Sequence, residues 1–257
     1  MKTVIAISGP TGVGKTAMAI SLANHFQSEI ISCDSRQFYK EMSIGVARPS
    51  MEELSAARHH FISFLSIEEE YTAGMFSRDA RAKIQELFQA NEVVVVVGGS
   101  MLYMDALLYG LDELPGDKEV RNTLNERCES EGLDVLAKEL QLKDPQFAAK
   151  ADLENAHRVI RALEVIQITG KPFSELLKQS SDAIDANIVH VFLSGDREWV
   201  YDRINVRVDK MVQEGLFEEV QELQSQRHLQ ALNTVGYKEI FKYIEGACSK
   251  EEAIVEI

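Results

Sequence analysis

Four short stretches of the chain are apolar almost throughout, where a half-exposed strand would alternate apolar with polar residues. They are Thr3–Ser8, Glu29–Cys33, Glu92–Val97 and Ile188–Leu193. Short β-branched runs of this kind are typical of parallel strands that are covered on both faces. The pattern therefore predicts four buried strands.

A small polar or glycine-rich turn follows each of these strands, and the turns read GPTGVGKT, DSRQ, GGS and SGD. Apolar residues then recur at helical spacing over Thr16–Phe26, Arg78–Gln89 and Met101–Leu108. Strands that alternate with helices indicate right-handed βαβ units and a parallel sheet. Ligands of such sheets bind at the carboxyl ends of the strands, where we expect the four turns to converge.

Residues 112–186 carry almost no strand pattern. Apolar residues recur there at helical spacing, at Val120, Leu124, Leu133, Leu136 and Leu140, and a second helix is predicted over Leu153–Thr169, ended by Gly170 and Pro172. We predict a core domain of residues 1–111 and 187–257 and a helical insertion of residues 112–186. After Arg197 a single long helical pattern returns to the core.

The turn after the first strand is a complete phosphate-binding loop of the form GxxxxGK[ST]. Its residues are Gly9, Pro10, Thr11, Gly12, Val13, Gly14, Lys15 and Thr16. Backbone amides of the loop and the helix N-terminus attract phosphate, the lysine adds a positive charge, and the threonine hydroxyl can bind Mg²⁺. The sequence thus predicts an α/β fold, a parallel sheet core like that of P-loop NTPases with an inserted α-helical domain.

The carboxylate that usually holds Mg²⁺ in nucleotide hydrolases is missing from the end of the third predicted strand, which runs into Gly98, Gly99 and Ser100. The nearest candidate is Asp34, after the second strand. It could assist a metal ion, act as a base toward a second substrate, or cap its own turn. These options leave a small-molecule kinase or an enzyme that holds a departing diphosphate.

Several turns together resemble the tRNA dimethylallyltransferases over nearly the whole chain. The shared segments are GPTGVGKT, DSRQFYKEMSIGVARPS, HHF, GGSMLY, HRVIRALE and VGYKE, in this order. The resemblance implies transfer of a dimethylallyl group from dimethylallyl diphosphate to the exocyclic amine of the adenosine 3′ of the anticodon, in tRNAs that read codons starting with U. It implies Mg²⁺ as cofactor, bound by Thr16 with Asp34 as a candidate second ligand, and a nucleotide-binding loop of the ATP-binding type.

In this resemblance Asp34 is the general base, and Lys15 and Thr16 stabilise the leaving diphosphate. The arginine that follows the last core strand in the family matches Arg207, with Arg203 as the competing choice. A relative that modifies free adenylate and a small-metabolite kinase remain the alternative functions. Transfer of label from dimethylallyl diphosphate to AMP alone would indicate the first, and transfer of phosphate from ATP without prenylation would indicate the second.

The resemblance also implies a set of tRNA contacts on the turns and on the helical insertion. These residues are Asp34, Ser35, Arg36, Gln37, Ser100, His157, Arg158 and Arg161. By contrast, we interpret His59 and His60 as structural residues, because neither has cysteine or carboxylate partners at metal-ligand spacing. Trp199 and Met42, Met101 and Met104 are interpreted as packing residues that could also border a pocket for a prenyl tail.

The net charge of the chain conflicts with the tRNA substrate that the resemblance implies, and the composition limits the compartment and the class of protein. The 257 residues carry a net charge of −14, with 27 basic against 41 acidic residues, which argues against nucleic-acid binding. The basic residues are nevertheless grouped on segments 36–48 and 155–171, which keeps tRNA tenable. Three scattered cysteines indicate a reducing cytoplasm, no apolar run is long enough to span a membrane, and we expect a monomer.

Overall fold

The computed structural model describes residues 1–112, 114–177 and 182–257 and divides into two compact units. One unit is Met1–Tyr109 with Ala183–Ile257, and the other is Gly110–Asp182. The boundaries differ by a few residues from the predicted insertion of 112–186. Ile184 belongs to the first unit because its side chain is buried in that unit's core and its amide donates to the carbonyl of Leu108 (2.9 Å). Of the predicted insertion, residues 113 and 178–181 lie outside the described residues.

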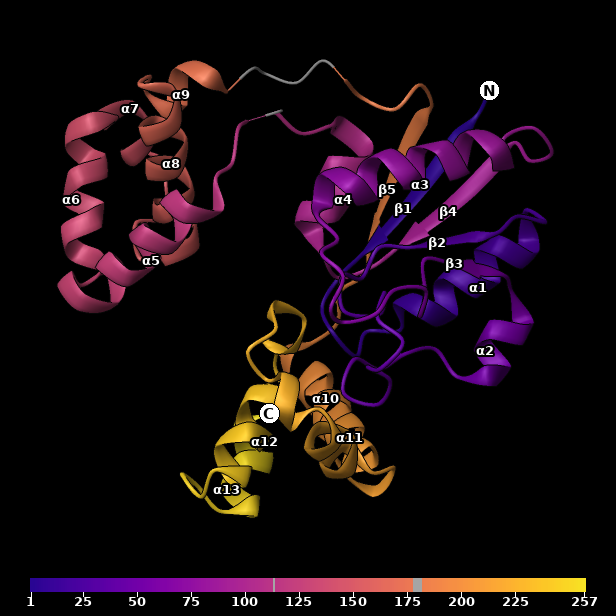
Figure 1. The fold of residues 1–257 in the computed structure, drawn as a ribbon. Helices are drawn as coiled ribbons and strands as arrows, with labels where there is room; N and C mark the ends of the chain where they lie inside the picture. The colour runs from indigo at the N-terminus through magenta and orange to yellow at the C-terminus, as the bar shows by residue number, and fades with distance from the viewer. Residues whose placement is uncertain (113, 178–181) are drawn as a thin grey trace. The chain divides into compact units, whose positions relative to one another are not determined.

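The first unit contains a five-stranded parallel sheet in the described residues, with strand order β3-β2-β4-β1-β5 (Figure 1). The strands are β1 (Thr3–Ser8), β2 (Ile30–Ser32), β3 (His59–His60), β4 (Val93–Val97) and β5 (Asn187–Phe192). The four predicted strands are present, each within a residue or two of its expected bounds. Strand β3 was not predicted, because two histidines carry no apolar signal, and it pairs with β2 at the edge of the sheet.

The central strands are buried on both faces, as their apolar runs predict. Val4 and Ala6 of β1 pack on the side of α3 (Ala73–Leu87) and α4 (Met101–Tyr109). Ile5 and Ile7 of the same strand pack on the opposite side with residues of α1 (Lys15–His25). Alternate side chains of a strand point to opposite faces, so one strand contributes to two cores.

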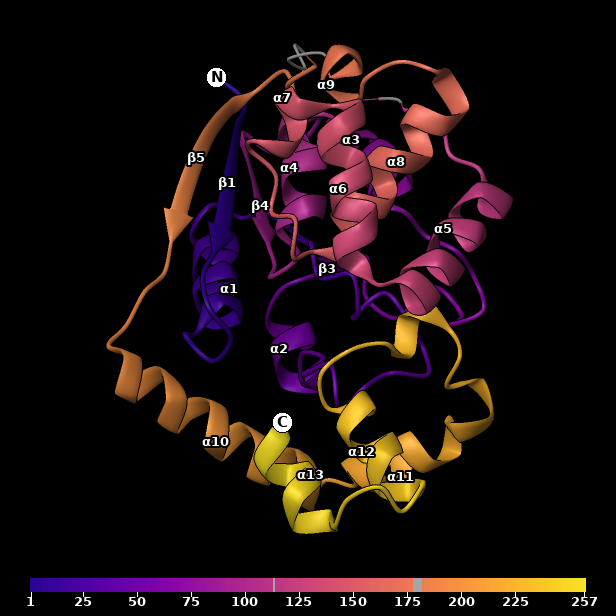
Figure 2. The same cartoon turned by 90° about the vertical axis from the view of Figure 1, so that its left-hand side faces the viewer.

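Strand β5 departs from the prediction of a strand covered on both faces. It pairs only with β1 at the sheet edge, and four of its six residues are exposed, with Phe192 70% accessible (Figure 2). The prediction was wrong because an apolar run reports the type of residue and not whether other elements cover both faces of the strand.

The predicted long helix after Arg197 is two helices, α10 (Arg197–Gln213) and α11 (Leu216–Glu222). Gly215 separates them with φ 102°, a left-handed conformation that a helix cannot continue through. Helix α11 and the following α12 (Tyr237–Ile244) pack on Tyr39 and Met42 from the segment after β2. The end of the unit thereby covers the loop that carries Asp34. The remaining elements of this unit are α2 (Met51–Ala56), α13 (Lys250–Glu256) and two short 3₁₀ helices, Gln224–Gln226 and Gln230–Leu232.

The second unit is helical in its described residues, as predicted. Its helices are α5 (Lys118–Glu131), α6 (Leu133–Lys143), α7 (Pro145–Ala148), α8 (Ala156–Thr169) and α9 (Phe173–Leu176). Leu124, Leu136 and Leu140 lie in its core. Helix α8 starts three residues later than predicted, where the Asn155 side chain accepts a hydrogen bond from the Arg158 amide (3.2 Å), and ends at Gly170 as predicted. No helix in the described parts of either unit is long and apolar enough to cross a membrane.

The loops after β2 and β4 touch at Gly98, which yields the first testable prediction. A Cβ atom at Gly98 would lie 1.8 Å from the carbonyl oxygen of Cys33. We expect Gly98→Ala to lower the free energy of unfolding by about 2 kcal/mol or more, since backbone must move to admit the methyl group. Urea denaturation measures the change.

Gly74→Ala is the matched control, because its Cβ would meet only the Thr72 hydroxyl oxygen at 3.8 Å and the residue lies in α3. Alanine is the better helix former, so this variant should match or exceed the wild-type stability. Equal stability of the two variants would show that the contact at Gly98 places no constraint on the fold.

Candidate active site

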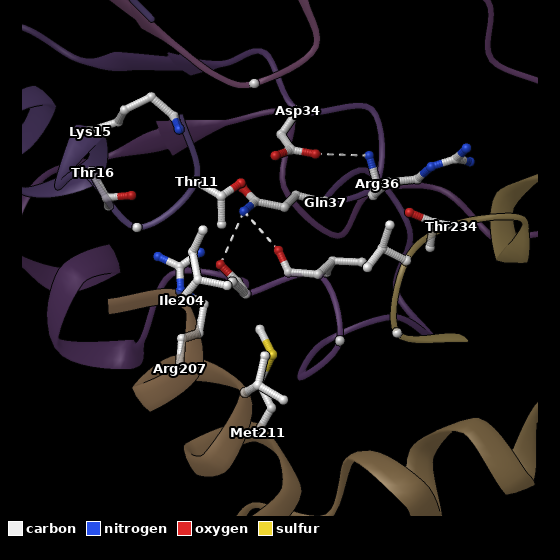
Figure 3. Close-up of a pocket in the computed structure, with 18 of the residues that line it drawn as sticks. Thr11, Lys15, Thr16, Asp34, Arg36, Gln37, Ile204, Arg207, Met211 and Thr234 are labelled. Carbon is white, nitrogen blue, oxygen red and sulfur yellow. Dashed lines mark hydrogen bonds between the residues drawn. The ribbon is translucent and has the colours of Figure 1, made fainter. Parts of the chain in front are cut away.

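The loops that follow β1, β2 and β4 border one pocket of about 610 Å³, as the strand topology predicts (Figure 3). Helix α10 and the segment before α12 complete its wall. Of the residues predicted for the site, the pocket is lined by Thr11, Gly12, Gly14, Lys15, Thr16, Asp34, Arg36, Gln37, Ser100 and Arg207. A contiguous site for a phosphorylated ligand and a second reactant can therefore be built from these side chains.

The phosphate-binding loop joins β1 to α1, and its conformation depends on glycine. Gly9 has φ 147°, and a Cβ there would lie 2.4 Å from the Leu193 carbonyl oxygen. The ammonium group of Lys15 donates to the carbonyls of Gly9 (2.9 Å) and Pro10 (2.8 Å), so it lies folded over the loop. Burial lowers the pKa of Lys15, and the negative charge of Asp34 opposes that shift.

Asp34 faces the phosphate loop across the pocket (Figure 3). Its Oδ1 accepts a hydrogen bond from the backbone amide of Arg36 (3.1 Å). Burial raises the pKa of Asp34 above its ordinary value, and the Arg36 amide and the charge of Lys15 offset only part of that rise. A partly buried carboxylate whose proton affinity is increased, close to a lysine, is suited to accept a proton from a bound reactant.

Ser35, Gln37 and Ser100 are held in place by contacts within the site. The Ser100 hydroxyl accepts a hydrogen bond from the Ser35 amide (2.9 Å) and links the loops after β2 and β4. The amide nitrogen of Gln37 donates to the carbonyls of Val46 (3.2 Å) and Ala47 (3.1 Å). The Ser100 hydroxyl also donates to the hydroxyl of Ser35 (3.0 Å), so all three side chains have protein partners.

Arg36 was expected to contact tRNA, and in this structure its guanidinium group binds backbone carbonyls. It donates to Gln230 (3.0 Å), Ala231 (3.1 Å) and Asn233 (3.2 Å), which lie before α12. In this conformation Arg36 fastens the end of the unit to the Asp34 loop. Its role toward tRNA stays a prediction.

The structure separates the two candidate arginines of α10. The Nε of Arg203 donates to the carbonyl of Gly12 (2.6 Å), and its guanidinium stacks 5.0 Å from the centre of the Trp199 ring, so Arg203 lines the pocket and at the same time supports the phosphate loop. Arg207 lines the pocket and forms no hydrogen bond or ion pair with the residues that the structure describes. Burial lowers its pKa, with a further contribution from the charge of Arg203. Both arginines line the pocket, but of the two only Arg203 is held by partners among the described residues, so Arg207 is the better placed to turn its guanidinium toward a ligand.

Sequence reasoning missed Glu219 of α11, which shapes one wall of the pocket. Its carboxylate accepts hydrogen bonds from the amides of Ser43 (3.0 Å), Ile44 (2.8 Å) and Gly45 (2.9 Å) and from the Tyr237 hydroxyl (2.6 Å). The loop held in this way leads directly to the carbonyls that bind Gln37. A lone glutamate in an amphipathic helix gives no sequence signal for such a role, although VGYKE did mark Tyr237.

The tRNA contacts predicted on the helical unit differ in their surroundings. His157 and Arg158 are exposed on α8. Arg161 donates to the carbonyls of Leu114 (2.9 Å) and Pro115 (3.0 Å) and to the carboxylate of fully buried Glu164 (2.9 Å). It thereby contributes to the interior of its own unit, while its contact with tRNA stays a prediction.

A second cavity of about 1150 Å³ adjoins the first, and both are bordered by Thr16 and Arg207. Trp199 lies in its wall together with Ile44, Leu54 and Met211. Met42 and Met104 are fully buried, which confirms them as packing residues, whereas Met101 is half exposed.

The raised pKa of Asp34 predicts a stability effect. Its pKa is higher in the folded chain than in the unfolded one, so the folded state binds a proton more readily, and the ionised carboxylate at neutral pH costs stability. We expect Asp34→Asn to raise the Tm at pH 7. As the pH falls through the window between the raised pKa and the ordinary value of 3.8, the wild type regains this stability and the difference shrinks.

Calorimetry of both proteins across this pH range measures the difference. Comparison of two proteins at each pH cancels the titration of all other carboxylates. A Tm difference that grows on acidification would show that the folded-state pKa of Asp34 is lowered.

Comparison with known proteins identifies the family. Residues 37–257 match the family described as "IPP transferase". The chain is 50% identical over 255 residues to a protein of Christiangramia forsetii named tRNA dimethylallyltransferase, covering 99% of the chain and 84% of that relative. A protein of the same name from Flavobacterium johnsoniae is 47% identical over 264 residues, covering 100% of the chain and 85% of the relative.

Solved structures agree with the sequence matches. The tRNA isopentenylpyrophosphate transferase of Bacillus halodurans superposes with a TM-score of 0.70 at 35% identity, covering 100% of this chain and 82% of that one. A eukaryotic dimethylallyltransferase described as acting on tRNA gives a TM-score of 0.78 at 27% identity, covering 99% and 66%. The α/β fold predicted from the sequence is thus the fold of these transferases. The chain belongs to the family of the tRNA dimethylallyltransferases.

Proposed function

We propose that this chain transfers a dimethylallyl group from dimethylallyl diphosphate to the exocyclic amine of the adenosine 3′ of the anticodon in tRNA. The observation that carries the proposal is the single pocket in which Asp34 faces Lys15, Thr16 and Arg207. A carboxylate opposite a cluster of cationic and hydroxyl groups suits a reaction in which one reactant loses a proton and the other loses a diphosphate. The names of the relatives support the same substrates.

Asp34 acts on the amine. The lone pair of an exocyclic adenine amine is delocalised into the ring, so the amine is a weak nucleophile. When the Asp34 carboxylate accepts a hydrogen bond from this amine, it increases the electron density on nitrogen and then takes the proton as the N–C bond forms. Its raised pKa favours this transfer over that to an ordinary aspartate.

The phosphate loop acts on the other reactant. The allylic C–O bond breaks as the N–C bond forms, and the bonding electrons leave with the diphosphate. Loop amides, Lys15 and Arg207 stabilise the negative charge that develops there. The Lys15 ammonium lies at the carbonyls of Gly9 and Pro10, at the start of the loop. A rotation of its side chain would therefore bring it to a phosphate bound by the loop.

Magnesium fits the donor set of this site. Mg²⁺ commonly takes one or two protein oxygens together with substrate phosphates and waters. Thr16 at the start of α1 lines the pocket and would hold the ion, and Asp34, which lines the same pocket, is the alternative ligand should it not act as the base. When bound, the ion neutralises charge on the departing diphosphate.

The adjoining cavity suits the isoprenoid tail. Ile44, Leu54, Trp199 and Met211 provide apolar walls, and the cavity meets the first one beside Thr16 and Arg207. A diphosphate bound between those two residues would therefore have apolar surface within reach.

The target base must leave the stacked anticodon loop to reach Asp34. We assign Ser35, Arg36, Gln37 and Ser100 to the pocket side of this contact, and His157, Arg158 and Arg161 to a contact on the helical unit. The three free cysteines suit a cytoplasmic enzyme, which we propose to act as a monomer.

A transfer assay tests the proposal. Chain, Mg²⁺ and labelled dimethylallyl diphosphate are incubated with unmodified tRNA or with AMP, and we expect label on tRNA alone. Asp34→Ala should lower kcat by about 10² to 10⁴-fold while the Kd of the diphosphate changes little, since the base contacts the amine and not the phosphates.

Asp196→Ala is the matched control, because Asp196 precedes α10, is exposed and does not line either cavity. Label on AMP alone, or phosphate transfer from ATP without prenylation, would contradict the proposal. Parallel loss of kcat and of diphosphate affinity in Asp34→Ala would assign Asp34 to the metal instead.

A further inference from the structure

His59 presents a buried nitrogen that has no partner. The Nδ1 atom lies 2.8 Å from the carbonyl oxygen of Ala57, and since a carbonyl can only accept, Nδ1 carries the hydrogen. The Nε2 atom of the neutral ring is therefore an acceptor. It is inaccessible to solvent and has no hydrogen-bond partner among the described residues. Burial also lowers the pKa of His59, which favours the neutral ring.

The neighbouring histidine shows that this state is specific to His59. His60 follows in β3, and its Nε2 contacts the carboxylate of Glu29. Buried polar atoms of native proteins nearly always have a partner, either protein or water, so the orphan Nε2 of His59 requires one.

His59 borders a small cavity next to the active site. This cavity of about 50 Å³ is distinct from the two larger ones, and its polar walls are formed by Lys15, Thr16, Ser32, Asp34 and Gln37. A water molecule needs roughly 10–15 Å³ of such volume and two to four polar partners. The space and the polar side chains together satisfy both requirements.

We propose that a water molecule resides in this cavity, donates one hydrogen bond to Nε2 of His59 and the other to the carboxylate of Asp34, and that His59 is thereby a positioning residue for Asp34. The hydroxyl group of Thr16 can donate to a lone pair of that water, whereas the Ser32 hydroxyl donates to the side-chain oxygen of Gln37 (3.4 Å). His59 itself is fixed by Ala57, and β3 is fixed by its pairing with β2, where His59 lies opposite Ile30. The sheet thereby orients the carboxylate through one ordered water. That Asp34 is the base rests on the proposed function, but the water does not.

The direct test is a high-resolution crystal structure of the whole chain grown with EDTA, so that any density in the cavity is independent of Mg²⁺. We expect one water within hydrogen-bond distance of both Nε2 and Asp34. ¹⁵N NMR of the imidazole should show the hydrogen on Nδ1. An empty cavity, or a water that appears only when Mg²⁺ is added, overturns the proposal whatever the enzyme's substrates are.

The positioning role is tested with His59→Phe and His59→Gln. Phenylalanine removes the acceptor at similar size, so kcat for tRNA should fall about tenfold while the KM for dimethylallyl diphosphate stays within about twofold. Glutamine restores an acceptor and should recover most of kcat. His60→Phe is the control and should leave kcat near wild type.

A wild-type kcat in His59→Phe overturns the positioning role, as does a loss that His59→Gln reproduces in full. Failure of the wild type to modify tRNA would refute the proposed function, and the crystallographic result would still decide the water.

Discussion

The site depends on the close approach of two loops at the carboxyl edge of the sheet. Strands β2 and β4 are neighbours, and Gly98 lets the end of β4 pass against the Cys33 carbonyl, where a Cβ would lie 1.8 Å away. Because Asp34 follows Cys33 directly and β4 lies between β2 and β1, the carboxylate is placed opposite the phosphate loop. The hydrogen bond from the Ser35 amide to Ser100 then joins the two loops beyond the glycine. A larger residue at position 98 would separate the groups that the chemistry must bring together.

The same arrangement buries charged groups, which lowers the stability of the folded chain. Burial raises the proton affinity of Asp34 and lowers that of Lys15, so both groups are destabilised in their charged forms, and the hydrogen bond from the Arg36 amide to Asp34 and the attraction between Asp34 and Lys15 oppose this only in part. Arg207 adds a further buried charge on the opposite wall. A diphosphate that enters this pocket supplies a negatively charged partner for Lys15 and Arg207. The apo site is thus tuned to its ligand at some expense of stability, as active sites commonly are.

The sequence was sufficient for the sheet, for the helical unit and for several residues that line the pocket, because these depend on short patterns. The phosphate loop is contiguous, and Asp34 and Ser100 directly follow strands that periodicity reveals. The exposure of β5 and the helix break at Gly215 were not predicted, because they depend on neighbouring strands and on one φ angle. The contacts of Arg36, Gln37 and Glu219 were not predicted either. Those of Arg36 and Glu219 join segments that are distant in the sequence, and that of Gln37 joins a side chain to a backbone carbonyl, which leaves no sequence pattern. His59 was interpreted as structural for want of metal partners, and only the three-dimensional structure exposes its unpaired nitrogen.

The central claim is that one pocket holds a diphosphate on the loop after β1 with its allylic carbon facing the carboxylate after β2. The most direct measurement is a crystal structure of this chain with Mg²⁺ and an unreactive thiolo analogue of dimethylallyl diphosphate. We expect the diphosphate on the amides of the loop, the Lys15 ammonium turned from the Gly9 and Pro10 carbonyls to a phosphate oxygen, Arg207 on the same group, and the first carbon of the tail directed toward Asp34. A diphosphate bound elsewhere, or a tail directed away from Asp34, would contradict the account.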